Sequence, residues 1–247
     1  MCFLLIVFSA FSNPIGNPSA PALLEEGCIL PDTSWTHPQV GFIGDYIGSK
    51  RLRSCHASED LHIRKGYFSG TAELATFTWN IREKLNLQAR AGTGQYSFRW
   101  NQMGQNIQGH ITGGVVWSGD AKLVVIAIKD TLFSADVQAG GWDFMSGSST
   151  VNAVYSTSNA RSKLRYWQTG FAFTQLIGIF SPYLGYAVNA SRFEISNLPT
   201  GTGHLHAKHK SGPFGGVTLT TGNRFSGNFE WRSFFEEGVS LSVALRF

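Results

Sequence analysis

Apolar and polar residues alternate along the last ten residues of the chain and along several earlier segments. Between positions 238 and 247, the odd positions are apolar and the even positions carry small or polar residues. The same period of two runs through residues 76–82, 85–92 and 225–232. This period is typical of β-strands that have one apolar and one polar face. The pattern therefore predicts an all-β protein.

The alternation gives each predicted strand two chemically different faces. The apolar face carries Phe77, Trp79, Leu87, Phe229, Leu241 and Val243. The opposite face carries Asn80, Arg82, Gln88, Arg90, Asn228, Glu230, Arg232 and Arg246. In a soluble barrel or sandwich the apolar face would form the core, whereas in a membrane barrel it faces lipid and the polar face lines the lumen. Alternation alone does not distinguish these two folds.

Composition and the N-terminus favour the membrane barrel. Charged residues make up 15% of the chain, against about 25% in a typical soluble domain. No apolar stretch reaches the length of about 18 residues that a transmembrane helix needs. Residues 2–11 form a short apolar segment of the length found in signal peptides, and Ala10 and Ser12 supply the small residues of a cleavage site. We therefore predict a signal peptide over residues 1–12.

The predicted fold is a closed antiparallel transmembrane β-barrel over residues 39–247, preceded by an N-terminal periplasmic segment over residues 13–38. Turn-like positions near residues 83, 130, 177 and 222 are evenly spaced, which gives about ten strands and a range of roughly eight to twelve. Closure is required because an open sheet edge in hydrocarbon would leave backbone groups without hydrogen bonds.

The end of the chain carries the candidate insertion signal. A terminal Phe247 that closes an apolar strand face, here with Leu245 and Val243, resembles the signal that outer-membrane barrels present to their insertion machinery. The predicted location is the bacterial outer membrane. Outer-membrane lipid and the barrel insertion machinery are the expected partners.

Two other segments carry structural expectations. Residues 123–128 are apolar on both faces, which is expected either of a buried strand or of a lumen filled by side chains. Long external loops are expected over residues 51–65, 95–109, 146–162 and 197–212, where Gly, Ser, Asn and Thr are frequent.

The reactive residue types do not form a recognisable catalytic or metal site. Cys2 falls in the predicted signal peptide, which leaves Cys28 and Cys55 as disulfide candidates, paired with each other or with another envelope protein. A histidine-rich segment over residues 203–209 is interpreted as a basic external loop. No nucleophile elbow is present, and the net charge of +4 is not concentrated in a nucleic-acid-binding motif. We therefore predict no enzyme activity, no metal, no cofactor and no nucleic-acid partner.

Several ordered segments resemble the chlamydial major outer membrane protein family. Residues 13–27 (NPIGNPSAPALLEEG) resemble its mature start, and residues 28–46 resemble its first Cys, Trp and strand. Residues 77–96 resemble its second hairpin, residues 166–193 resemble it through SPYLG and NASRF, and the final Arg-Phe matches as well. The chain is shorter than the family's members and lacks most of their cysteines.

The resemblance implies an outer-membrane porin that also contributes to envelope structure, with a possible homo-oligomer or disulfide-linked neighbours. The alternative is a non-conducting barrel with a structural or adhesive role, because about ten strands lie near the closed end of the size range. If the barrel conducts, the four arginines and one glutamate of the polar face, formally +3, predict a preference for anions.

Overall fold

The computed structural model describes residues 14–20, 36–54, 66–81, 84–102, 105–144, 147–151, 154–156, 161–198, 201–207, 210–221, 225–233 and 236–246. Its strands are β1 (Thr36–Ser54), β2 (Gly66–Ile81), β3 (Leu85–Gln102), β4 (Gln105–Ile128), β5 (Thr131–Phe144), β6 (Gly147–Val151), β7 (Val154–Ser156), β8 (Arg161–Gln175), β9 (Phe180–Leu198), β10 (Gly201–Ala207), β11 (Ser211–Thr221), β12 (Phe225–Arg232) and β13 (Glu237–Arg246). Within these described parts, no helix is long and apolar enough to cross a membrane.

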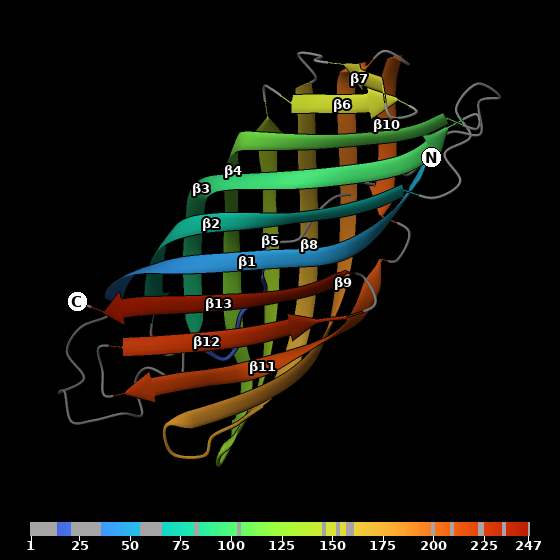
Figure 1. The fold of residues 1–247 in the computed structure, drawn as a ribbon. Helices are drawn as coiled ribbons and strands as arrows, with labels where there is room; N and C mark the ends of the chain where they lie inside the picture. Colours follow the sequence, from blue (N-terminus) through green and yellow to red (C-terminus); the bar gives the residue numbers. More distant parts are fainter. Residues whose placement is uncertain are drawn as a thin grey trace, which may run out of the picture.

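Ten of the strands close into an antiparallel barrel. In Figure 1, β1 to β3 and β11 to β13 cross the front of the molecule, and β5, β8 and β9 run behind them. The first and last strands pair with each other, with Val40 opposite Leu245 and Tyr46 opposite Val239. The short strands β6, β7 and β10 extend the sheet at one end. The predicted fold class and strand number are therefore confirmed.

The two ends of the barrel differ in their connections. Two to four residues join β2 to β3, β4 to β5, β8 to β9 and β11 to β12 at one end. The start of β1 and the end of β13 lie at this same end, since Gln39 is opposite both Arg246 and Thr78. Short turns mark the periplasmic side of such barrels. The opposite end, with β6, β7 and β10, is therefore the outer end.

The apolar face changes sides part of the way along the long strands. In the periplasmic half of β3, Leu87 points outward and Arg90 points inward. In the outer half, Phe98 points inward and Arg99 points outward. β2, β5 and β8 change in the same manner. We call the periplasmic half the membrane band; its outer wall is apolar. In the outer half the interior is apolar and the outer wall is polar, as in a soluble protein.

The strands project well beyond the membrane. β4 has 24 residues, whereas a membrane-crossing strand needs about 9–11. At about 3.3 Å per residue and a tilt of about 45°, the excess reaches roughly 30 Å from the bilayer. The expected long loop over residues 95–109 is accordingly wrong, because β3 continues to Gln102 and β4 begins at Gln105. Gly113, at the irregular point of this pairing, has a φ of 73°, which glycine adopts without strain.

Apolar and aromatic side chains fill the outer half of the barrel. Trp142 and Phe193 are 0% and 1% exposed. The Phe68 and Tyr96 rings stack with centroids 4.6 Å apart, and Phe144 meets Tyr96 edge-on at the same separation. Burial raises the pKa of the Tyr96 hydroxyl well above its usual range. We call this cluster the outer core; it comprises Ile43, Ile47, Phe68, Ala72, Leu74, Tyr96, Phe98, Trp100, Ile107, Ile111, Val116, Trp142, Phe144, Leu164, Tyr166, Phe193, Ile195 and Leu205.

The doubly apolar segment over residues 123–128 does not fill the lumen. Most of its side chains are exposed on the outer wall at the periplasmic end of β4, including Ile126 and Ile128. Only Val124 packs inward, against Leu132. A bulge between Val124 and Ile126 shifts the register and turns successive side chains outward. Both interpretations offered by the sequence are wrong for this segment.

Candidate functional site

The structure places most of the predicted polar face inside the barrel. Residues on the inward side are Asn80, Gln88, Arg90, Asn228, Glu230, Arg232 and Arg246. Residues exposed on the outer wall are Phe77, Trp79, Leu87, Phe229, Leu241, Val243 and Leu245. Lying outside the described residues are Arg82, Phe247, Cys28, Cys55 and residues 1–12.

An ion-pair network surrounds Arg232 in the barrel interior. The Arg232 guanidinium contacts Asp45 at 2.5 Å, Glu230 at 3.0 Å and Glu236 at 2.6 Å. Lys50 Nζ lies 3.2 Å from the other oxygen of Glu236. None of these side chains is exposed to solvent. Because buried charges persist only when they are paired, the network fixes β1 against β12 and against Glu236, the residue before β13.

A second cluster is centred on Arg90 of β3. Its guanidinium lies 3.0 Å from Asp120 of β4 and donates hydrogen bonds of 3.0 and 2.7 Å to the Gln88 side chain. Lys122 and Asp136 are also buried on the inward face of the neighbouring strands. The Arg90 cluster lies in the polar interior of the membrane band. The Arg232 network lies nearer the outer core, because its Asp45 alternates along β1 with Ile43 and Ile47.

The interior charges nearly cancel. Among the described residues, the buried cations are Lys50, Arg90, Lys122 and Arg232. The buried carboxylates are Asp45, Asp120, Asp136, Glu230 and Glu236. With the inward but only partly buried Arg246, the described interior has a formal charge of 0. The expected anion preference was based on a sum of +3 that also counted Arg82, which lies outside the described residues. The sequence reasoning overlooked Asp120 and Lys122, although both alternate with Trp117, Gly119 and Ala121 along β4.

Residues 14–20, which we call the N-terminal plug, lie inside the barrel. The backbone N–H groups of Ile15 and Gly16 donate to the two oxygens of Glu230, at 3.1 and 2.6 Å. The Pro14 carbonyl accepts a 2.6 Å hydrogen bond from Arg90. The plug thus joins the two charge clusters. The sequence predicted a periplasmic segment over residues 13–38. In the structure, residues 14–20 instead lie in the lumen, and β1 already begins at Thr36.

Side chains also hold the plug to β5, β8 and β11. The Asn17 amide donates to Thr218 Oγ1 at 3.1 Å, and its carbonyl oxygen accepts from Thr174 Oγ1 at 2.9 Å. The hydroxyl groups of Ser19 and Ser134 are 2.8 Å apart. A cavity of about 80 Å³ remains between the plug and the surrounding strands. The plug therefore fills most of the polar interior.

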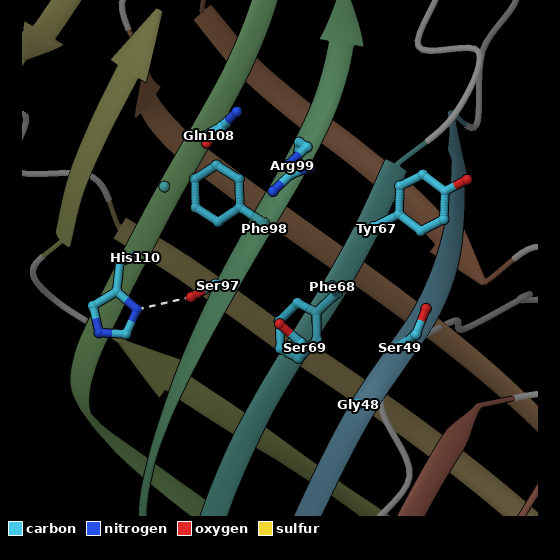
Figure 2. Close-up of a pocket in the computed structure, with 11 residues that line it drawn as sticks. Gly48, Ser49, Tyr67, Phe68, Ser69, Ser97, Phe98, Arg99, Gln108 and His110 are labelled. Carbon is cyan, nitrogen blue, oxygen red and sulfur yellow. Dashed lines mark hydrogen bonds between the residues drawn. The ribbon is translucent and has the colours of Figure 1, made fainter. Parts of the chain in front are cut away.

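A groove of about 520 Å³ lies on the outer wall at the outer ends of β1 to β4. Figure 2 shows Ser97 and His110 pointing toward each other across neighbouring strands, with Ser97 Oγ 2.9 Å from His110 Nδ1. Tyr67 and Arg99 border the same groove. The described lining residues include no carboxylate that would orient the histidine, which a hydrolytic triad requires. Ser97 and His110 are direct partners in the strand register, so their hydrogen bond links β3 and β4 on the sheet surface.

No protein-family model and no curated protein sequence matches the chain. Among solved structures, the outer membrane protease OmpT from Escherichia coli is 10% identical, with 90% of this chain and 97% of that chain covered and a TM-score of 0.45. An outer membrane channel from Pseudomonas putida F1 is 8% identical, with 89% and 100% covered and a TM-score of 0.46. The outer membrane protein OprG from Pseudomonas aeruginosa is 10% identical, with 87% and 96% covered and a TM-score of 0.35.

The closed barrel, its apolar outer band and its short turns at one end define the chain as an outer-membrane β-barrel. Backbone hydrogen bonds are satisfied around the whole circumference, as hydrocarbon requires. The outward side chains of the band, such as Trp79, Leu184 and Leu241, are large, apolar and exposed. This combination is stable only in a lipid phase. The protein is therefore located in the bacterial outer membrane.

Proposed function

We propose that the protein is a closed, non-conducting outer-membrane barrel with a structural or adhesive role at the cell surface. The outer core carries this proposal. A water-filled passage leaves the side chains along its wall accessible to water, whereas Trp142 and Phe193 are inaccessible. Ten strands lie near the small end of the size range, at which about eight strands leave an interior just filled by side chains. The plug adds a second block in the membrane band.

The projecting half of the barrel supports a surface role. Its interior is packed like a soluble protein's, so the outer end is a rigid extension of the membrane band. Its outer wall is polar, with Ser97, Arg99 and His110 in contact with solvent. Such an extension presents the outer ends of β3 and β4, together with β6, β7 and β10, well above the bilayer, where they can contact neighbouring envelope components or another cell.

A porin is the second candidate, favoured by the polar interior of the membrane band. Charged and amide side chains such as Arg90 and Gln88 would suit the passage of small hydrophilic solutes. Membership of the chlamydial major outer membrane protein family, which the sequence resemblance suggests, belongs with this candidate. Conduction would require the plug to leave and the outer core to open.

Planar-bilayer recording separates the two candidates. The refolded full chain is inserted into a bilayer, and its insertion is verified separately by heat-modifiable migration of protein recovered from vesicles. We expect no discrete conductance steps above the leak of the bare membrane. Reproducible steps from the unaltered chain would reject the closed barrel and favour the porin.

A further inference from the structure

We propose that the rim of the membrane band on β8 and β9 binds the phosphate groups of an outer-leaflet glycolipid. The site is a basic patch on the outer wall that we call the rim patch. Its basic residues are Arg161, Lys163, Arg165 and Arg192. The proposal is independent of whether the barrel conducts.

The depth of the patch is set by aromatic side chains. On β8, Trp167 and Phe171 face outward within the apolar band, and Arg165 and Lys163 are the next outward residues toward the outer end. Trp side chains collect where the hydrocarbon meets the headgroups. The basic side chains therefore lie at the level of the lipid headgroups in the outer leaflet.

The patch places like charges side by side. Arg165 of β8 and Arg192 of β9 are direct partners in the strand register. Like charges opposite each other on one sheet face destabilise the pair. Arg192 is exposed, and in the described part of the chain neither it nor Lys163 forms an ion pair. An anion between the two strands would remove this repulsion.

Arg165 is already fixed in position. Its guanidinium forms two hydrogen bonds, of 2.7 and 2.9 Å, with the carboxylate of Asp143. The guanidinium carbon also lies 5.5 Å from the centre of the Trp117 ring, which is a cation–π distance. An arginine held in this way loses little conformational entropy when it binds a further anion.

The local charge favours an anionic lipid. Four basic side chains face two carboxylates, Asp143 and Glu194, so the patch has a formal charge of +2. Guanidinium groups match phosphate oxygens with two parallel hydrogen bonds. A phosphorylated glycolipid supplies such oxygens at this depth, while its acyl chains cover Trp167 and Phe171 of the band. The chemistry therefore points to a lipid phosphate.

The test compares bisphosphorylated lipid A with the same lipid after removal of its phosphates. Binding to the refolded full chain in non-ionic detergent is measured by thermophoresis, for the unaltered protein and for Arg192→Gln, Lys163→Gln and the double variant. Lys84→Gln, which removes one exposed charge at the periplasmic end, is the matched control. Each rim substitution should weaken lipid A binding about fivefold, the factor for one basic residue at an anionic surface, and the control should not.

A second measurement excludes a purely structural effect. Without lipid, Arg192→Gln should unfold at the same or a higher urea concentration, because a like-charge contact is removed, yet lose the stabilisation that lipid A gives the unaltered chain. Equal binding of dephosphorylated lipid A, or unchanged affinity of the Lys163→Gln and Arg192→Gln double variant, would overturn the proposal. Displacement of lipid A by excess inorganic phosphate would likewise show a free-anion site and overturn it.

Discussion

At the scale of single residues, Arg232 is the centre of the barrel's interior. Its three ion pairs, with Asp45, Glu230 and Glu236, join strands far apart in the sequence and are closed to solvent. Glu230 in turn accepts the two plug hydrogen bonds. One side chain thus supports both the wall and the plug.

Replacing Arg232 by Met should strongly destabilise the barrel, because three buried carboxylates lose their shared cation. We expect a loss of about 3–5 kcal/mol in the free energy of unfolding, measured by urea titration in detergent micelles. Arg246→Met is the matched control; this arginine is only partly buried at the periplasmic rim, and we expect a loss below about 1 kcal/mol. Equal losses in the two variants would show that the network does not contribute as described.

At the scale of elements, β3 shows what its sequence could and could not predict. The alternation over residues 85–92 correctly gave an outward Leu87 and an inward Arg90. The inward Tyr96 and Phe98 were missed, because the apolar phase moves from odd to even positions across Gly92 and Gly94. The shift is visible in the sequence. Whether the apolar side chains face lipid or the barrel interior depends, however, on where along the strand the bilayer ends, and no local sequence pattern marks that position.

Because of this phase shift, the free-energy cost of placing a charge on the outward face of β3 depends on its position along the strand. Leu87→Arg should lower barrel stability by about 2–4 kcal/mol, because the guanidinium enters hydrocarbon. Ser97→Arg, on the same outward face of β3 but in the outer half, should cost at most about 1 kcal/mol. The fraction of heat-modifiable, folded protein after refolding into vesicles, followed across a urea series, measures both. Similar losses would contradict the assigned position of the membrane band.

The plug should loosen when its central side chain is shortened. Asn17→Ala removes hydrogen bonds to Thr218 and Thr174 and the local one to the Ser19 amide. At about 0.5–1.5 kcal/mol for each bond, hydrogen exchange of the Ile15 and Gly16 amides should accelerate by at least about fivefold. Thr221→Ala, an exposed change at the periplasmic end of β11, serves as control. Unchanged exchange in Asn17→Ala would show that the plug is held by its backbone contacts alone.

At the scale of the whole molecule, two blocks lie in series along the barrel axis. The plug fills the polar interior of the membrane band, and the outer core fills the projecting half. The alternating pattern and the even spacing of the turns predicted a closed barrel of about ten strands, because alternation, turn spacing and closure are all properties of the wall. They did not predict the plug, because Ile15 and its partner Glu230 are 215 residues apart and residues 14–20 have no periodicity.

Removing one block should leave the barrel closed, and removing both should open it. A chain that begins at residue 21 lacks the plug, yet we expect it to remain silent in planar bilayers, because the outer core still excludes water. Trp142→Asn with Phe193→Ser replaces two fully buried rings of that core by small polar side chains, which allow water to enter where an apolar cavity would stay dry. In the full chain this pair should also stay silent; combined with removal of the plug, it should give discrete steps. Heat-modifiable migration of each variant checks that it has folded. Conductance from the shortened chain alone would show that the outer core does not close the barrel, and it would move the protein from a closed surface barrel to a porin gated by its own N-terminal segment.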